Sequence, residues 1–220
     1  KGRLLTTLLL VIHGEDWLML LPSDNADSVI KRLQMFVMRA DVQLVLAEDL
    51  SSSIASIAGN DNDIWSCTAP DNDSIVALPG KLALIISNSG SDTDTSEQQL
   101  VAAGIPEVSA ATSGELLPQS INLDLIGGVS FNKGCYTGQE IVARLHFRGT
   151  PARRLYRLNK PVGTTLSRGD KIIDHTGTAV GMVVRDAAGS ECLLASLKTK
   201  ATDSTLSSES DIQLSQPLAL

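Results

Sequence analysis

The sequence predicts an α+β protein with a small antiparallel barrel or sandwich at its C-terminal end, and three observations lead to this prediction. Of the 220 residues, 43% are hydrophobic and 20% are charged, which is the composition of a globular chain that can bury a core. Apolar residues recur at helical spacing over residues 26–38, between runs that favour strands. After Pro151, short apolar runs alternate with Gly, Asp and Asn, as is typical of consecutive antiparallel strands.

The N-terminal residues predict a β-hairpin followed by a helix. Residues 3–12 and 17–21 are strand-like apolar runs, and the residues His13-Gly14-Glu15-Asp16 between them predict a short turn. Pro22-Ser23-Asp24 favours the start of a helix, which the apolar spacing extends over residues 26–38.

Large apolar side chains gather at the end of this helix. Met35, Phe36 and Met38 form a stripe that is far more typical of a packed core than of a cofactor site, so we expect these side chains in the core. Residues 42–47 follow as a predicted strand.

The middle of the chain is acidic and polar, with two apolar stretches. Residues 51–57 and 75–87 predict strands, the second stretch holding one or two of them. Residues 87–96 read SNSGSDTDTS, a composition that predicts a loop or a disordered linker. Residues 97–103 predict a short helix that ends at Gly104.

The C-terminal region predicts a separate β-domain. Its strand-like runs are Leu155–Leu158, Lys171–Ile173, Thr178–Arg185 and Glu191–Leu197, with a further one expected within Asp211–Leu220. Runs of this length and spacing favour a small barrel or sandwich. We therefore expect a domain boundary between residues 149 and 150, which gives domains 1–149 and 150–220.

Composition restricts the class of protein and its compartment. No apolar run approaches the roughly 18–20 residues of a membrane span, so we expect no direct membrane contact. Three cysteines, an odd number, do not make a disulfide framework, and we expect a cytoplasmic protein. Because the chain opens at Lys1 inside an apolar run, we expect it to be incomplete at its N-terminus.

The charges are distributed unevenly. A net charge of −7 and only seven aromatic residues make direct nucleic-acid binding an unlikely function on sequence grounds. One segment has six basic residues against the single acidic Glu140: Lys133, Arg144, Arg148, Arg153, Arg154 and Arg157. This basic segment is either a local site for an anion or a solvated face, and charge alone does not separate the two interpretations.

The strongest chemical signal is Cys135. Four glycines lie within residues 127–138, which predicts tight backbone turns or a close approach to a ligand. Thr137 and Glu140 have the spacing of a capping box, so a helix is expected to begin there, just after the cysteine. The helix N-terminus and Lys133 would both favour the thiolate form of Cys135, which makes it a candidate catalytic residue. The alternative is a small buried side chain in a structural turn.

The other cysteines and the histidines carry weaker signals. We interpret Cys67 and Cys192 as structural. The three histidines lack metal-ligand spacing with any cysteine, so no metal site is expected, and His146 is a minor candidate for a second catalytic group.

Residues 133–140 read KGCYTGQE and resemble the signature octapeptide of the YgfZ family. These are folate-binding proteins of tRNA modification and iron–sulfur cluster maintenance, related to the aminomethyltransferase (T-protein) of glycine cleavage. Further segments resemble the family: residues 1–3, 39–42, 103–106, 117–119, 122–123, 127–131, 142–144 and 147–149.

The resemblance implies a ring of ferredoxin-like or Greek-key α+β domains plus a C-terminal β-barrel, with tetrahydrofolate held in a central channel. Residues 1–149 would then be the folate-binding T-protein-like region. It also implies a catalytic role for Cys135 with Lys133, and iron–sulfur enzymes, including tRNA-modifying ones, as partners. Seven residues are implied in cofactor binding: Tyr136, Gly138, Gln139, Glu140, Arg144, Arg148 and Arg154. The anionic glutamate tail of a folate would suit Arg148, Arg153 or Arg154.

Two other functions remain open at this point. The first is a tetrahydrofolate-dependent aminomethyltransferase, although Ala102 stands where T-protein-like sequences carry a pterin-binding glutamate. The second is a non-catalytic scaffold in which the octapeptide is only a turn that joins two domains.

Overall fold

The computed structural model of the chain describes residues 2–47, 50–57, 64–68, 73–87, 95–210, 212–215 and 217–220. The chain divides into two compact units. The smaller unit is Thr6–Ser96, and the larger unit combines Lys1–Leu5 with Glu97–Leu220. The predicted boundary near residue 149 falls within the larger unit and stays a prediction.

The smaller unit begins with the predicted hairpin, which is confirmed. Strands β1 (Leu9–His13) and β2 (Asp16–Leu20) pair antiparallel around a turn in which Gly14 has φ of 60°. A short 3-10 turn (Ser23–Asn25) leads into α1 (Ala26–Gln34). The hairpin is fixed to the neighbouring sheet through Ser74, whose hydroxyl lies 2.8 Å from His13 Nδ1 and donates to Ile12 O.

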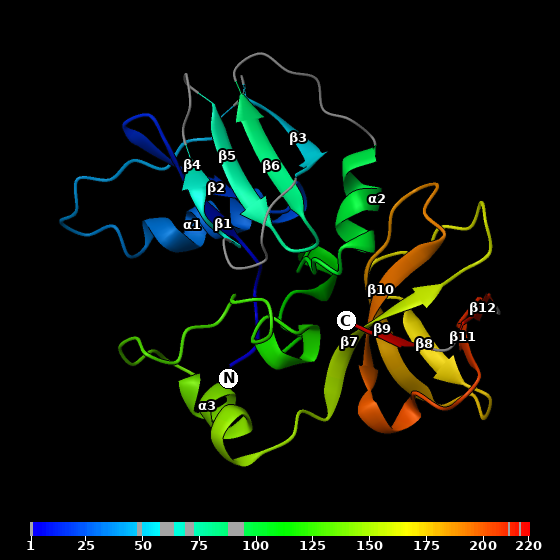
Figure 1. The fold of residues 1–220 in the computed structure, drawn as a ribbon. Coiled ribbons are helices and arrows are strands. Elements are labelled where there is room, and N and C mark those ends of the chain that lie inside the picture. The colour runs from blue at the N-terminus through cyan, green and yellow to red at the C-terminus, as the bar shows by residue number, and fades with distance from the viewer. Residues whose placement is uncertain are drawn as a thin grey trace. The chain divides into compact units, whose positions relative to one another are not determined.

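An antiparallel sheet of four strands forms the rest of the smaller unit (Figure 1). Its strands are β3 (Ser51–Ser56), β4 (Cys67–Thr68), β5 (Ser74–Leu78) and β6 (Leu82–Ser87), in the order β3-β6-β5-β4. The predicted strands at residues 51–57 and 75–87 are thus confirmed. Of the linker predicted at 87–96, residues 88–94 lie outside the described residues.

Two predictions for the smaller unit are wrong. Met35, Phe36 and Met38 were expected in the core, but they are 67%, 70% and 87% exposed. Helix α1 ends at Gln34 and contains no fully buried residue, so its apolar stripe is only partly covered by the unit. Residues 42–47 are irregular rather than a strand. Periodicity reports which side of a segment is apolar, but burial also requires a surface to pack against.

The larger unit combines short helices with one antiparallel sheet of seven strands. The helical elements are α2 (Thr95–Ala102), η3 (Ala110–Thr112), η4 (Pro118–Ile121), α3 (Gln139–Arg148) and η5 (Thr199–Ala201). The strands are β7 (Arg153–Asn159), β8 (Lys171–Asp174), β9 (Ala179–Arg185), β10 (Cys192–Lys198), β11 (Leu206–Ser208), β12 (Gln213–Leu214) and β13 (Leu218–Ala219). The predicted helix near residues 97–103 and the C-terminal strands are confirmed.

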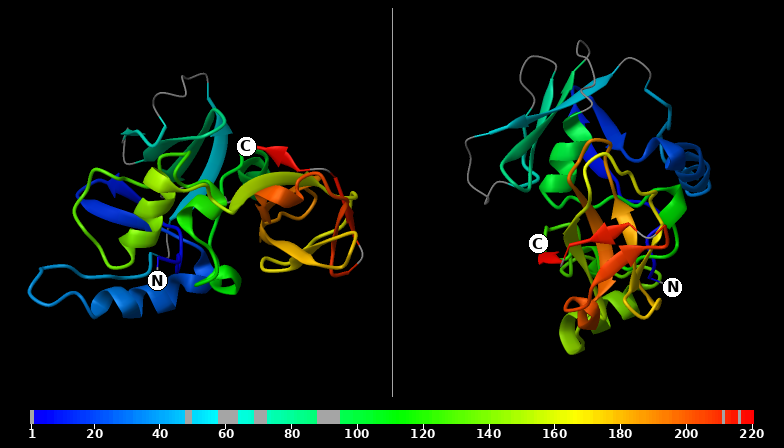
Figure 2. Two further views of the ribbon diagram at one scale, coloured as in Figure 1. Left: turned by 90° about the horizontal axis from the view of Figure 1, so that it is seen from below. Right: turned by 90° about the vertical axis from the view of Figure 1, so that its right-hand side faces the viewer.

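The sheet curls into a half-barrel (Figure 2). Its strand order is β12-β11-β8-β9-β10-β7-β13, and in the described residues each edge strand pairs with one neighbour only. The predicted mixture of helices and strands is confirmed and is compatible with the α+β class, and the C-terminal region is an open, curled antiparallel sheet. The finer expectation, a T-protein-like arrangement with a barrel, stays a prediction.

Two apolar clusters hold the larger unit together. One fills the concave side of the curled sheet, with fully buried Leu158, Val183 and Leu193 among its members. The other packs the helical segments against β7, β9 and β10, and includes Leu116 and Ile121. The helices and the sheet therefore share a core, which explains why residues 97–220 form one compact unit.

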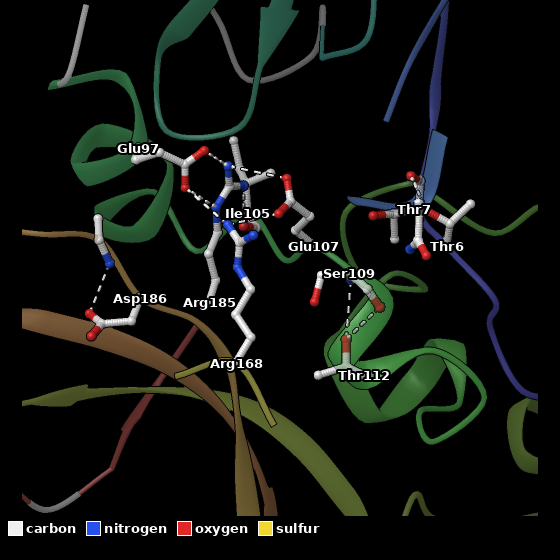
Figure 3. A network of polar contacts seen from close by, with 12 residues as sticks. Thr6, Thr7, Glu97, Ile105, Glu107, Ser109, Thr112, Arg168, Arg185 and Asp186 are labelled. Atoms are coloured by element: carbon white, nitrogen blue, oxygen red, sulfur yellow. Dashed lines mark hydrogen bonds and ion pairs between the residues drawn. The ribbon is translucent and has the colours of Figure 1, made fainter. Parts of the chain in front are cut away.

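A network of ion pairs ties α2 and the segment after it to the sheet (Figure 3). Arg185 Nη2 lies 2.6 Å from Glu97 Oε1 and 3.6 Å from Glu107 Oε2, and Arg168 Nη2 lies 2.8 Å from Glu107 Oε1. Burial raises the pKa of Glu97, but the hydrogen bond from Arg185 and the charges of Arg185 and Arg168 outweigh this effect. The pKa of Glu97 therefore lies below its usual value.

Candidate functional site

The residues that precede the octapeptide are fixed to the core of the larger unit by amide side chains. Asn122 accepts a hydrogen bond from Leu155 N and donates one to Leu155 O, so its side chain pairs with β7 in the manner of a strand. Gln119 Nε2 donates to Val142 O at 2.7 Å and links η4 to α3. The octapeptide loop is thus held at both ends, by the η4 segment and by α3.

Cys135 lies in an irregular loop at the surface. Its side chain is exposed, and residues 134–136 belong to no helix or strand. The alternative interpretation, a small apolar side chain buried in a turn, is therefore wrong. An exposed thiol can react with, or bind, a molecule that approaches from solvent.

Helix α3 begins later than the capping-box pattern predicts. Its N-cap is Gly138, which has φ of 93°, and no side chain caps the helix. Gln139 Oε1 instead accepts a hydrogen bond from Tyr136 N at 3.1 Å. The prediction of Thr137 as the N-cap is wrong because the left-handed glycine turns the chain between Thr137 and the first helical residue. Cys135 consequently lies three residues before the N-cap, where the helix dipole is weaker.

Lys133 and Tyr136 flank the thiol in sequence and contact each other. Lys133 Nζ lies 4.9 Å from the centroid of the Tyr136 ring, within the range of a cation–π interaction. The ammonium group therefore stabilises the loop by covering an aromatic face. The predicted role of Lys133 in favouring the thiolate stays a prediction.

His146 belongs to an aromatic cluster that the sequence analysis missed. Its ring stacks on Phe131 with 3.6 Å between centroids, and Phe147 packs edge-on against both rings. This cluster folds the start of the loop back onto the end of α3. The signal was available in the apolar residues Phe131 and Phe147 on either side of the octapeptide, but their contact depends on the path of the loop.

The basic segment does not act as one cluster. Arg154 Nη1 lies 2.6 Å from Asp124 Oδ1 and also donates to Gln119 O, and Arg157 donates to Ala102 O. Arg144 and Arg148 are exposed on α3, and neither forms an ion pair with a described residue. Arg154 is thus held by its own fold, whereas the two arginines of α3 are available to an anion.

The remaining implied residues lie at the beginning of α3. Glu140 is exposed in its first turn, while Gly138 and Gln139 are half-buried. The loop residues, Arg144 and Arg148 thus lie on one continuous segment, 133–148. Arg154 lies outside this segment and is paired with Asp124. Among the residues that the structure describes, no group of three or more His, Cys, Asp or Glu side chains could hold a metal ion.

No protein-family model matches the chain. Within the described part of the chain, every helix is too short or too polar to cross a bilayer. The fold and the site define a mixed α+β protein with an exposed thiol in a loop before a basic helix. The resemblance to the YgfZ family stays a prediction.

Proposed function

We propose that the protein is a folate-binding accessory protein that supports iron–sulfur enzymes, including those that modify tRNA, and that Cys135 is its functional thiol. The observation that carries this proposal is the exposure of Cys135 within the KGCYTGQE loop, three residues before the N-cap of a helix whose two arginines form no ion pair with a described residue. An exposed thiol in a loop that is anchored at both ends can react with, or bind, a molecule that approaches from solvent.

The residues of this segment fit the glutamate tail of a folate better than its pterin ring. Arg144 and Arg148 are exposed cations without an ion-pair partner among the described residues, so they suit the carboxylates of a glutamate tail. Tyr136 is 42% exposed and Lys133 already covers its ring, so the loop offers a surface rather than an enclosed slot for a pterin. When bound, a folate would supply a one-carbon acceptor, and the chain's part would be to bind the tail and to present the thiol.

Tetrahydrofolate binding is tested by titrating its monoglutamate and triglutamate forms into the full chain. Replacing Arg144 and Arg148 by Gln should weaken the triglutamate by about tenfold more than the monoglutamate, because only the longer tail offers several carboxylates. A matched control replaces the exposed Arg32 and Arg39 of the smaller unit by Gln. Equal losses for both ligands, or equal effects of both double variants, would contradict the tail assignment.

The role of the thiol is tested in cells that lack the native protein. Cys135→Ser should leave the circular dichroism spectrum and the melting temperature unchanged, since the side chain is exposed, but should lose support of iron–sulfur enzyme activity. Cys67→Ser is the control because Cys67 is the other exposed thiol. Full activity of the Cys135→Ser protein would favour the scaffold, in which the packing of Phe131 against His146 is all that the loop provides.

A further inference from the structure

The larger unit contains a cavity of about 350 Å³. Its described walls include no residue of the octapeptide. The walls come from Arg3, from residues within the segments 115–120 and 151–153, from Leu145 and from Met182. This volume is within the range of sites for small molecules, which runs from roughly 300 to 1,000 Å³.

Arg153 is the cation in this wall that lacks a partner. It is half-buried on β7, and no described residue forms an ion pair or a side-chain hydrogen bond with its guanidinium group. Its neighbour Arg154 is paired with Asp124, and Arg157 on the same strand donates to Ala102 O. A partly desolvated guanidinium without an anion is unfavourable, and a bound carboxylate would remove that cost with two parallel hydrogen bonds.

The other charged groups of the wall leave Arg153 uncompensated. Arg3 Nη1 donates to Glu115 O and lies 3.8 Å from Glu115 Oε2, so these two side chains offset each other. The wall therefore carries one net positive charge, which favours a ligand with a single negative charge.

The rest of the wall is mainly apolar and contains one unsatisfied acceptor. Leu117, Leu145, Pro151 and Met182 are half-buried and can pack against a hydrocarbon or aromatic body. Gln119 is 1% exposed, and its Oε1 has no hydrogen-bond partner among the described residues although Nε2 is bonded to Val142 O. Buried acceptors of this kind are rare in folded proteins, and a donor group on a ligand that reached the oxygen would satisfy it.

We propose that this cavity binds a small organic monocarboxylate, with Arg153 holding the carboxylate and the leucine, proline and methionine side chains packing against its apolar body. The proposal goes beyond the function proposed above and does not depend on it, because it involves neither Cys135 nor the arginines of α3. The two therefore fail separately: loss of tetrahydrofolate binding would leave this site intact, and the reverse also holds.

The test is a titration of the ¹⁵N-labelled full chain with benzoate, followed by amide chemical shifts. Benzoate should bind with a dissociation constant on the order of 1 mM, as expected for so small a ligand. It should shift the backbone amide signals of the wall residues within 116–120 and 151–153 that carry an N–H group: Leu116, Leu117, Gln119, Ser120, Ala152 and Arg153. Benzamide, which has the same shape without the charge, and acetate, which has the charge without the ring, should each bind at least about tenfold more weakly.

Substitutions of Arg153 test whether this residue binds the carboxylate of benzoate. Arg153→Gln should weaken benzoate by about tenfold or more, whereas Lys200→Gln, an equal change of charge at an exposed residue outside the cavity, should have no effect. Arg153→Lys, which keeps the charge and loses the planar fork, should give an intermediate affinity and guards against misfolding of the Gln variant. Equal binding of benzoate and benzamide, unchanged affinity in Arg153→Gln, or shifts confined to α3 would each overturn the proposal.

Discussion

The strongest stability prediction concerns the buried ion pair between Lys160 and Asp186. Lys160 Nζ lies 2.9 Å from Asp186 Oδ1, and the two side chains are 0% and 1% exposed. The carboxylate also accepts hydrogen bonds from Leu166 N at 2.7 Å and from Ala187 N at 2.9 Å. The pair therefore lies at the junction of β7, the following turn and the end of β9, with its hydrogen-bonding capacity filled.

Lys160→Met removes the cation and leaves the carboxylate buried. Two unit charges 2.9 Å apart attract each other by about 6 kcal/mol at an effective dielectric constant of about 20. Part of this attraction only offsets the desolvation of the lysine, which the substitution also removes. The expected loss is thus about 3–5 kcal/mol in the free energy of unfolding, or roughly 10–15 °C in melting temperature for a unit of this size.

The assay is urea denaturation followed by far-ultraviolet circular dichroism, with hydrogen exchange of residues 153–198 to assign the loss to the sheet. The double variant Lys160→Met with Asp186→Asn should recover part of the stability, because an amide oxygen can still accept from Leu166 N without an unpaired charge. A loss below about 1 kcal/mol in Lys160→Met would refute the reasoning, since it would mean that water reaches the carboxylate. A double variant no more stable than the single one would do the same.

Two further predictions follow from the larger unit. Because its pKa is lowered in the folded state, ionised Glu97 stabilises the protein fully above its usual value of 4.5, and this contribution is lost as the pH falls through the folded pKa. The stability difference between wild type and Glu97→Gln should therefore shrink between neutral pH and acid, and a constant difference in urea midpoints would contradict this. Gly181→Ala should cost about 1–3 kcal/mol, because the added Cβ would lie 2.6 Å from the backbone oxygen of Ser196, as well as 2.3 Å from Leu197 Cδ2. Gly134→Ala, with no atom within 4 Å, should be nearly neutral in the same melting experiment, and equal effects would show that β9 and β10 can separate.

Local sequence patterns predicted strands correctly where the pairing strand is the next apolar run along the chain. The hairpin of β1 and β2, the pair β5 and β6, and the strands of the curled sheet were all predicted, because each has an adjacent run with matching period and a turn between them. The prediction that Met35, Phe36 and Met38 lie in the core failed for the opposite reason, since none of the described residues of the smaller unit covers the end of α1.

For the candidate site, too, some sequence predictions were correct and others were wrong. The glycines predicted tight backbone turns around the thiol but left open whether Cys135 is exposed or buried, and the structure places it exposed in an irregular loop. The capping box failed because the left-handed Gly138 moves the start of α3, a backbone choice that Thr137 and Glu140 do not fix.

The sequence by itself determined the mixture of helices and strands, most of the strands and the turns around the thiol, because these follow from the spacing of apolar residues and from glycines along the chain. Only the tertiary structure decided how the basic residues are used. Arg154 meets Asp124 and Arg157 meets Ala102 O, while Arg153 lines a cavity and forms no ion pair with a described residue. Charge in a sequence is additive, but ion pairing depends on distances of a few ångströms between residues that are far apart in the chain.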